Sequence, residues 1–344
     1  MKVLVTGATG QVGSRLVRQL LSNNYEVKAV ILPDDPNRSR IDGLDIEVIE
    51  GNLLNISVCE RAMDKISYLI HTANLVGPLP GMSEPEFFNN NVMNTFNLVS
   101  TASKYADRIL LVYISSSSVY PNDSHSIATV YNPVDEMHPL RPEGAYAIGK
   151  LAGEEIVKGY SRQTGLRSVI LRPSGICSGT AILGRWNVGF VIGILKAGQS
   201  SPRSSLYMKD GTELWHDLES AAGSMDQLCA ISDRFNAPWI YQPVDARDVA
   251  RACICAIESK TTSGEVFNIS APEPITFTDA AEVISEATGL TILQWHVPVR
   301  WIYDLNNIKA KYTLNYKPKW GIKEMVQSAI VIQRGESESL NGYN

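Results

Sequence analysis

The amino-acid sequence predicts an α/β protein with a doubly wound parallel sheet and a smaller, less regular C-terminal part. Apolar runs of strand length alternate with amphipathic helical segments throughout the first 176 residues. Several runs end in glycine, asparagine or serine, as expected where the carboxyl ends of parallel strands meet a ligand. Beyond residue 176 the alternation fades, and it returns clearly only over residues 244–269.

The regular part contains six predicted strands in succession. The apolar periodicity places them at residues 2–6, 25–32, 45–50, 68–72, 109–114 and 167–171. Helical patterns run from Leu16 to Leu21 and over residues 87–105 and 145–164. Later in the chain we expect a helix over 245–257, a strand over 265–269 and a helix over 278–288 that Thr278 caps.

These elements predict two domains. Residues 1–176 form the sheet domain, and residues 244–269 return to it. Residues 177–243 and 270–334 form the smaller domain, in which residues 198–243 show no clear strand periodicity. Residues 335–344 are polar, and we expect them to form a frayed tail.

Composition excludes several classes of protein. With 344 residues, 44% hydrophobic and 19% charged, the chain resembles an ordinary globular protein of one large or two interlocked domains. A net charge of -5 gives no support to binding of nucleic acid or an anionic membrane. The longest apolar stretch, near residues 188–195, is far shorter than the roughly 20 residues of a membrane span.

The cysteines and the N-terminus indicate the compartment. Five cysteines are an odd number and lack zinc-ligand spacing, so we expect buried free thiols and no metal. The first strand begins at residue 2, which leaves no room for a signal peptide. Both observations favour the reducing cytoplasm.

The first thirteen residues carry a glycine pattern between a strand and a helix. In Gly7-Ala-Thr-Gly10-Gln-Val-Gly13, the free N–H groups and the positive end of the following helix can hold a pyrophosphate. Gly7 permits the turn, Gly10 lets the backbone approach the phosphates, and Gly13 lets the helix pack against the strand. The spacing differs by one residue from the usual dinucleotide fingerprint, and a turn that merely needs glycine is the plainer alternative.

A tyrosine and a lysine lie four residues apart on a predicted helix, so Tyr146 and Lys150 share one helix face. At an effective dielectric of about 20, an ammonium about 4 Å away is worth roughly 4 kcal/mol to a phenolate. Because about 1.4 kcal/mol moves a pKa by one unit, the phenol could be drawn toward neutrality. It could then exchange a proton with an alcohol or ketone while a cofactor carries the hydride.

Four serines, residues 115–118, end the fifth predicted strand, where a substrate would lie. A serine there can hydrogen-bond the substrate oxygen and orient it toward the tyrosine. Four serines alone could be only a polar loop, and an exposed Tyr/Lys pair alone could be chance. The order of glycine loop, serines and Tyr146/Lys150 along the chain favours a catalytic site.

In this order of motifs the chain resembles an extended short-chain dehydrogenase/reductase of the NAD-dependent epimerase/dehydratase type over nearly its whole length. The resemblance implies a Rossmann sheet domain with a smaller substrate-binding domain. The family places its catalytic Ser or Thr three residues before a Val-Tyr pair, so Val119-Tyr120 selects Ser116. By this resemblance Tyr146 is the acid/base, Lys150 lowers its pKa and holds the nicotinamide ribose, and Ser116 orients the substrate oxygen.

Other segments extend the resemblance. Asn52 stands where the family usually has an adenine-contacting Asp, and residues 71–74 resemble its cofactor loop. Asn91 resembles a structural Asn, residues 171–173 the segment beside the nicotinamide, and residues 304–320 the C-terminal signature. The cofactor-binding residues implied are Gly7, Thr9, Gly10, Gln11, Val12, Gly13, Asp34, Asn52, Leu53, Thr72, Ala73, Asn74, Asn91, Tyr146, Lys150 and Pro173.

Three departures from the family bear on the substrate. Sugar-nucleotide enzymes usually have an Asn where this chain has Gly175, and an Arg near residues 236–243, which are aromatic and uncharged here. Dehydratases follow the catalytic hydroxyl residue with Asp-Glu, whereas this chain has Ser117 and Ser118, which disfavours dehydration. A diphosphate clamp is therefore not visible in the sequence. Cations that could replace it are Arg185, Lys196, Arg203 and Lys209, each of which could equally be a solvated surface residue.

We expect the substrate to be a small molecule. Substrate-contacting candidates, beside the catalytic residues, are Ser117, Ser118, Gly175 and Asn187. For the cofactor, the two family positions at the end of the second strand hold Ile31 and Leu32 rather than an acid or arginine. Asp34 and Asp35 follow sooner than Arg38 and Arg40, which favours NAD and leaves NADP open.

The predicted function is NAD(P)-dependent hydride transfer to or from a secondary alcohol or ketone, with an epimerase on a sugar or sugar nucleotide preferred by family analogy. One alternative is a dihydroflavonol-reductase-like ketoreductase that uses NADPH on a small hydrophobic ketone. The other is a non-catalytic dinucleotide sensor or scaffold, against which an intact Ser/Tyr/Lys set argues. Resemblance also implies a homodimer that pairs through the helices at 87–105 and 145–164.

Overall fold

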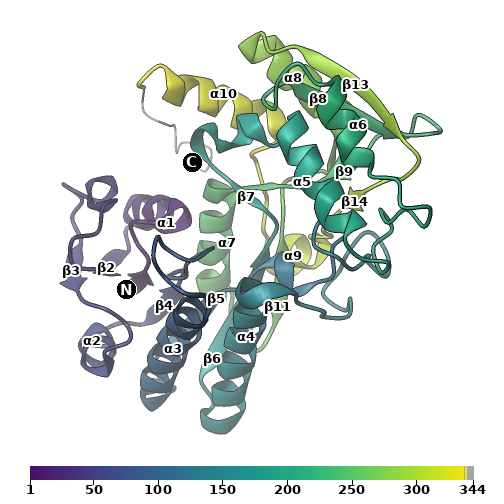
Figure 1. Ribbon diagram of the computed structural model, residues 1–344. Helices are drawn as coiled ribbons and strands as arrows, with labels where there is room; N and C mark the ends of the chain where they lie inside the picture. Colours follow the sequence, from purple (N-terminus) through teal and green to yellow (C-terminus); the bar gives the residue numbers. More distant parts are fainter. Residues whose placement is uncertain (337, 339–344) are drawn as a thin grey trace.

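The computed structural model describes residues 1–336 and 338, and its largest feature is a seven-stranded sheet (Figure 1). Neighbouring strands are all parallel and follow the order β11-β6-β5-β4-β1-β2-β3. The strands are β1 (Lys2–Thr6), β2 (Glu26–Ile31), β3 (Glu47–Glu50), β4 (Tyr68–His71), β5 (Leu110–Ile114), β6 (Arg167–Pro173) and β11 (Val266–Ile269). The predicted doubly wound α/β fold is confirmed.

The order of strands reverses between β1 and β4. From β1 the chain proceeds outward to β2 and β3, and it then returns to β4 and proceeds the other way through β5 and β6. In open α/β sheets, ligands bind outside the carboxyl ends of the strands at such a reversal. The glycine loop that follows β1 therefore lies at the expected place for a cofactor.

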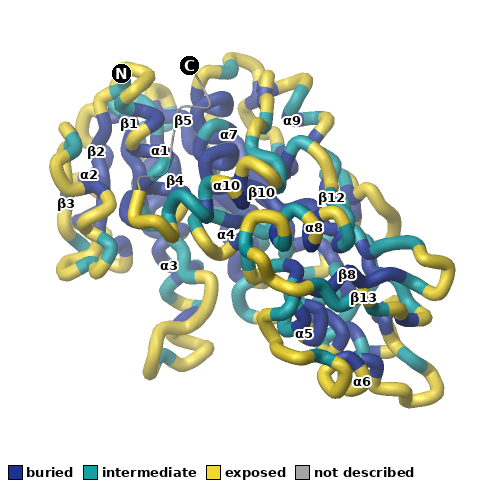
Figure 2. Tube along the Cα trace, turned by 90° about the horizontal axis from the view of Figure 1, so that it is seen from above, coloured by how far each residue is buried: buried dark blue, intermediate teal, exposed yellow. Residues whose placement is uncertain are grey.

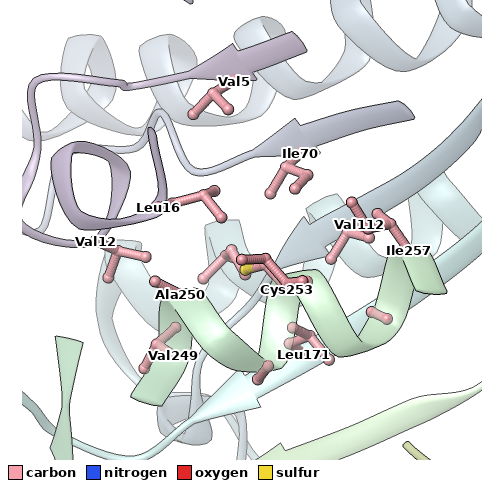
Figure 3. Close-up of a cluster of buried hydrophobic side chains, with 14 of the residues drawn as sticks. Val5, Val12, Leu16, Ile70, Val112, Leu171, Val249, Ala250, Cys253 and Ile257 are labelled. Atoms are coloured by element: carbon pink, nitrogen blue, oxygen red, sulfur yellow. The ribbon is translucent and has the colours of Figure 1, made fainter. Parts of the chain in front are cut away.

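Both faces of the sheet are covered by helices because side chains alternate along each strand. Val3 and Val5 pack with the helices α1 (Gln11–Ser22) and α7 (Ala246–Glu258), as Figure 3 shows for Val5. Leu4 faces the other way, into a core formed with α2 (Ile56–Ala62), α3 (Glu84–Ala102) and α4 (Gly144–Thr164). This sandwich explains why the strand runs are almost continuously apolar.

The smaller half is built from short pieces around a third core (Figures 1 and 2). Its helices are α5 (Val188–Gln199), α6 (Leu214–Ala221), α8 (Phe277–Thr288) and α10 (Ile322–Gln333). Its strands are β7 (Ile176–Cys177), β8 (Leu228–Asp233), β9 (Ile240–Tyr241), β12 (Ile275–Thr276), β13 (Ile292–Val297) and β14 (Ile302–Tyr303). The strand β10 (Val244–Asp245) and the helix α9 (Ile308–Thr313) instead contribute Val244 and Ala310 to the core of the sheet half. Short 3₁₀ turns are η1 (Arg38–Arg40), η2 (Ser103–Tyr105), η3 (Ser117–Val119) and η4 (Gly179–Gly184).

Aromatic rings fill the core of the smaller half. The Trp301 ring stacks at 5.5 Å from Tyr241 and at 6.4 Å from Tyr303. Trp186, Trp239 and Trp301 are each at most 1% exposed. Large aromatic rings let this half bury much apolar area with little regular secondary structure.

Three details differ from the predictions. The helix near residue 278 is capped by Thr276, whose hydroxyl accepts from Asp279 N at 3.0 Å, so the assignment of the cap to Thr278 was wrong. Helix α3 begins at Glu84, before the predicted start, because Ser83 and Glu86 form a capping box. Residues 198–243 contain α6 and β8, and β8 was missed because its first four residues, 228–231, form a short apolar run that does not alternate.

The predicted frayed tail, residues 335–344, falls largely outside the described residues. Of its described part, Glu338 lies near Arg15 on α1 and forms an ion pair with it at 2.5 Å. No helix among residues 1–336 and 338 is long and apolar enough to cross a membrane.

Candidate active site

The glycine loop is closed tightly by the chain around it. Gly7 has φ +68, and a Cβ there would lie 2.8 Å from Ala73 N. A Cβ on Gly13 would lie 2.0 Å from Gly7 O. The three predicted glycines therefore hold the start of α1 against the end of β1, where Gly10 is the helix N-cap. This cradle fits the pyrophosphate of a dinucleotide.

The aspartate that lies beside the glycine loop is Asp35. Thr9 Oγ1 donates to Asp35 Oδ2 at 2.6 Å, and Arg40 donates to the Thr9 carbonyl at 3.0 Å. Asp34, the predicted cofactor residue, is exposed, with φ +56. The turn after β2 reverses the chain at Asp34 and directs the next residue inward. Sequence order could not separate these two neighbours, because only the turn decides which one faces the loop.

The predicted cofactor segment after β4 is held against β1. Thr72 Oγ1 donates to the Thr6 carbonyl at 2.7 Å, and Ala73 N donates to Thr6 Oγ1 at 3.3 Å. Asn91, on α3, binds both the N–H and the carbonyl of Leu75 at 2.9 Å. Both ends of the Asn91 amide are thus used to fix the segment that contains Thr72, Ala73 and Asn74.

The remaining predicted cofactor residues lie in a loop, at the end of a strand and at the start of a helix. Asn52 is exposed, and its Oδ1 accepts from Leu54 N at 2.9 Å, while Leu53 is buried. Pro173 is buried at the end of β6. Gln11 and Val12 begin α1 at the glycine loop.

Ser116, Tyr146 and Lys150 converge at the carboxyl ends of β5 and β6. Tyr146 and Lys150 lie on the first turns of α4, and Lys150 Nζ is 5.8 Å from the centre of the Tyr146 ring. A hydrogen bond between Ser116 and Tyr146 lowers the pKa of the tyrosine, against burial, which raises it more strongly. The hydroxyl of Ser116 also accepts from Ser118 N at 3.1 Å, which fixes the turn η3.

Lys150 is buried among groups that set its charge. Its Nζ donates to the Ile114 carbonyl at 2.8 Å and lies 5.4 Å from the centre of the Tyr113 ring. Burial lowers the pKa of Lys150 to about 7, and the carboxylate of Glu154 opposes this shift. Buried His71 has its pKa lowered to about 3 by burial and by Lys150, so it is neutral at pH 7 and adds no positive charge.

A buried ion pair, which the sequence analysis did not predict, lies one helical turn from Lys150. Glu154 is fully buried one turn beyond Lys150 and receives two hydrogen bonds from Arg172, at 2.8 and 2.6 Å. Ser115 Oγ donates to the same carboxylate at 2.6 Å, and Arg172 also donates to the Tyr120 hydroxyl at 2.8 Å. The position of Glu154 four residues after Lys150 could have indicated it, but its pairing with β6 could not be read from the chain.

Of the predicted substrate residues, Ser117 and Ser118 lie in the turn η3 after β5, whereas Asn187 lies at the start of α5 in the smaller half. The carbonyl of Ser117 accepts from the Tyr303 hydroxyl at 3.1 Å. The hydroxyl of Ser118 is buried without a hydrogen-bond partner among the residues described. Asn187 caps α5 by accepting from Phe190 N at 2.9 Å.

A tertiary contact explains why residue 175 is a glycine. A Cβ at this position would lie 1.8 Å from the Tyr241 hydroxyl. Tyr241 is on β9, within the aromatic, uncharged segment that distinguishes this chain in sequence. Two departures from the family, Gly175 in place of an Asn and the aromatic segment of residues 236–243, are therefore explained by one packing contact.

A parallel sheet with a tight glycine loop at its switch point defines a dinucleotide-binding protein. Residues 3–214 match the NAD dependent epimerase/dehydratase family, and because the match covers more than half of the chain, the protein belongs to this family. The predicted resemblance is confirmed. The family is NAD-dependent, so NAD, the cofactor favoured by the sequence, is confirmed as well.

Relatives of the chain include enzymes whose names indicate that they act on sugar nucleotides or on a steroid. The chain is 30% identical to the putative UDP-glucose 4-epimerase of Methanocaldococcus jannaschii over 51% of its own length, and it spans little more than half (55%) of that relative. It is 23% identical to UDP-glucose 4-epimerase of Bacillus subtilis over 100% of this chain and 99% of that one. It is 25% identical to 3 beta-hydroxysteroid dehydrogenase/Delta 5→4-isomerase of Mycobacterium tuberculosis over 88% and 74% of the two chains.

Solved structures show the same fold over the whole chain. A short-chain dehydrogenase/reductase superfamily protein from Agrobacterium tumefaciens with bound NAD has a TM-score of 0.77 at 25% identity, covering 97% and 98% of the two chains. UDP-glucuronic acid 4-epimerase from Bacillus cereus in complex with NAD has a TM-score of 0.70 at 21% identity, covering 98% and 99%. Family and fold together support an NAD-dependent enzyme of the epimerase type.

Proposed function

We propose that the protein is an NAD-dependent epimerase of a sugar or sugar nucleotide that works by reversible oxidation of a secondary alcohol. The observation that carries the proposal is the convergence of Ser116, Tyr146 and Lys150 beside the end of β5. Full-length alignment with a UDP-glucose 4-epimerase supports the sugar class.

Each of the three side chains has a distinct task. Tyr146 removes the hydroxyl proton of the substrate and later returns it to the carbonyl oxygen. Lys150 favours the phenolate of Tyr146 through its positive charge, and Ser116 donates a hydrogen bond to the reacting oxygen. When bound, NAD supplies the hydride acceptor and donor, and presentation of the other face of the ketone gives the epimer.

The glycine loop holds the cofactor in this proposal. The N–H groups at the start of α1 bind the pyrophosphate, and Asp35 accepts from the adenosine ribose hydroxyls. The clamped segment of Thr72, Ala73 and Asn74 closes the other side.

Replacement of Tyr146 by Phe tests the mechanism. Removal of a general acid/base typically lowers turnover by about 10² to 10⁴-fold, and we expect NAD binding to remain close to that of the wild type. The assay is interconversion of UDP-glucose and UDP-galactose, with dinucleotide released by denaturation measured by chromatography. Unchanged turnover of Tyr146→Phe would contradict the mechanism.

A second candidate is an NAD(P)-dependent ketoreductase or dehydrogenase on an apolar substrate. The hydroxysteroid dehydrogenase relative favours it, as does the uncharged segment of residues 236–243. An epimerase regenerates its cofactor in each cycle, whereas this enzyme consumes it stoichiometrically. Absorbance at the reduced-nicotinamide band during turnover of a hydrophobic ketone separates the two.

The proposal includes the organisation of the chain. Separate hydrophobic cores support a cofactor domain of residues 1–176 and 244–269 and a substrate domain of 177–243 and 270–334, although Ala310, Leu314 and Tyr316 pack into the core of the sheet half. Exposed Phe96 and Ile148, on α3 and α4, support a homodimer through these helices, which light scattering would test. All five cysteines are free and buried, which supports the reducing cytoplasm.

A further inference from the structure

His71 is a buried histidine that the proposed proton transfer does not use. It is the last residue of β4 and is only 1% exposed. Its Nδ1 lies 2.8 Å from Thr6 Oγ1 on β1, and its Nε2 lies 3.1 Å from Thr95 Oγ1 on α3. The ring therefore joins the strand that precedes the glycine loop to the helix that contains Asn91.

The hydrogen bonds around the ring determine which nitrogen holds the proton. Thr95 Oγ1 donates to the Asn91 carbonyl at 2.9 Å, so its oxygen is left to accept from Nε2–H of His71. Thr6 Oγ1 accepts from Ala73 N–H at 3.3 Å, so its own hydrogen can go to Nδ1. In the opposite tautomer Nδ1–H would face Thr6, whose hydroxyl hydrogen would lose this acceptor. That loss is costly because Thr6 is fully buried.

His71 is neutral in this position. Burial and the positive charge of Lys150 lower the pKa of His71 to about 3. The Tyr113 ring lies 5.7 Å from the imidazole and 5.4 Å from Lys150 Nζ. A neutral imidazole accepts at one nitrogen and donates at the other, whereas a doubly protonated one can only donate. The chain of hydrogen bonds therefore has one direction, from Ala73 N–H to the Asn91 carbonyl.

Both ends of this chain hold the segment of residues 72–75. Ala73 N–H is the first donor, and Asn91, whose carbonyl is the last acceptor, binds the N–H and the carbonyl of Leu75 through its side chain. The segment packs tightly on the glycine loop, since a Cβ on Gly7 would lie 2.8 Å from Ala73 N. A displacement of Ala73 would therefore disturb the turn that fits the pyrophosphate.

We propose that His71 is a positioning residue for the cofactor. As the Nε2–H tautomer, it turns the Thr6 hydroxyl hydrogen toward Nδ1, so that the Thr6 oxygen accepts from Ala73 N–H and holds residues 72–75 against the glycine loop. The inference rests on the proposed cofactor site and adds a residue that acts through this segment. Nδ1 is the atom on which the effect depends, because it is the acceptor that orients the hydroxyl.

Two substitutions separate the two ring nitrogens. In His71→Asn the amide oxygen takes the place of Nδ1 and can still accept from Thr6. In His71→Gln the longer side chain brings its amide to the place of Nε2, so Thr6 loses its acceptor. Isothermal titration of NAD, after removal of bound dinucleotide, gives the affinities. We expect roughly tenfold weaker binding by His71→Gln and binding within about threefold of the wild type by His71→Asn.

A merely structural role for His71 gives the reverse order. Asn is the smaller side chain, so it leaves the larger cavity and would be the more damaging replacement. Equal affinities of the two variants, or weaker binding by His71→Asn, would overturn the inference.

Thr6→Val tests the same contact from its other side. The matched control is Thr101→Val, because Thr101 is also fully buried and its hydroxyl donates to the Asn97 carbonyl of its own helix at 2.7 Å. We expect Thr6→Val to weaken NAD binding as much as His71→Gln does, and Thr101→Val to bind NAD as the wild type does. The double variant Thr6→Val/His71→Gln should show no further loss. Additive losses would overturn the inference, and the two valine variants decide it should His71→Gln fail to fold.

Nuclear magnetic resonance reads the tautomer directly. In protein labelled with ¹⁵N at its five histidines, long-range correlation of ring hydrogens and nitrogens distinguishes a protonated nitrogen from a bare one. The signal of His71 is the one missing from His71→Asn. We expect a bare Nδ1 and a protonated Nε2. A protonated Nδ1 would overturn the inference whatever the affinities of the variants.

Failure of this inference is distinguishable from failure of the proposed function. If the wild type binds NAD and neither His71→Gln nor Thr6→Val binds it more weakly, the inference alone fails. If the wild type binds no NAD, the proposed cofactor site fails and the inference fails with it. Turnover of Tyr146→Phe tests the proton transfer separately, because the affinities for NAD are measured without substrate.

Discussion

The sheet half and the smaller half of the molecule form their hydrophobic cores by different means. In the sheet half, strands of four to seven residues pair in register and present alternating faces to helices. In the smaller half, several strands have only two residues, and stacked rings such as Tyr241, Trp301 and Tyr303 fill the core. The first arrangement follows from the alternation of side chains along each strand. The second depends on contacts between residues that are distant in sequence.

This difference extends to the close contacts of the two halves. In the sheet half, backbone packs against backbone, as in the close approach of Gly13 to Gly7. In the smaller half, a side chain makes the close approach, as in that of Tyr241 to Gly175. A substitution should therefore be less tolerated where it meets backbone than where it meets the tip of a side chain.

The largest expected effect concerns the buried pair that joins α4 to β6. Glu154→Gln leaves Arg172 buried without its counter-charge, which costs about 3–5 kcal/mol in the free energy of unfolding. Urea denaturation measures the loss. The adjacent Glu155, which is exposed and bonded to Lys158, supplies the control Glu155→Gln, whose stability should stay within about 0.5 kcal/mol. Equal stability of the two variants would contradict the role of the pair.

The same variant should change the pH dependence of activity. The charge of Glu154 raises the pKa of Lys150, which burial lowers to about 7. Without Glu154 that pKa falls further, so Lys150 loses its proton at a lower pH and stops favouring the phenolate. The alkaline limb of kcat/KM should therefore move to lower pH in Glu154→Gln and stay in place in Glu155→Gln. A shift toward higher pH would show that Glu154 acts otherwise.

Gly13→Ala tests the backbone side of the comparison. The new Cβ would lie 2.0 Å from Gly7 O, and neither strand nor helix can yield easily. We expect a loss of about 3 kcal/mol, seen as roughly a hundredfold weaker NAD binding in a fluorescence titration. Wild-type affinity in this variant would show that the loop is more adaptable than its packing indicates.

Asp35→Asn tests which acid serves the cofactor. Because Asp35 lies against Thr9, loss of its charge should weaken NAD binding about tenfold and reduce the preference for NAD over NADP. Asp34→Asn is the matched control and should bind NAD as the wild type does, since Asp34 is exposed. The reverse ranking would restore Asp34 as the cofactor residue.

The smallest expected effect is that of Gly175→Ala. Its Cβ would lie 1.8 Å from the Tyr241 hydroxyl and 3.2 Å from Cζ of the same ring, so it meets one side chain and no backbone, and we expect a loss of about 1 kcal/mol in stability. Removal of that hydroxyl in the double variant Gly175→Ala/Tyr241→Phe should restore thermal stability. If the double variant melts no higher than the single one, the clash lies elsewhere.

The local sequence pattern was sufficient to predict the regular helices and strands. Helix α4 was predicted from residue 145 and begins at Gly144, and Tyr146 and Lys150 lie on one face as expected. The parallel sheet followed from apolar runs that are buried on both faces. Cap positions were less secure, because Thr276 and Thr278 are equally good caps and only the incoming strand β12 selects Thr276.

The class of fold, the glycine loop and the order of serine, tyrosine and lysine could be predicted from the sequence, because these features depend on residues close together in the chain. Only the folded chain shows that Asp35 faces Thr9 and that Arg172 pairs with Glu154. Each of these contacts is made when a turn or a distant strand brings together side chains that no local pattern relates. The residues of the cofactor loop could therefore be predicted from the sequence. The side chains on which substrate recognition depends come together only when the chain folds.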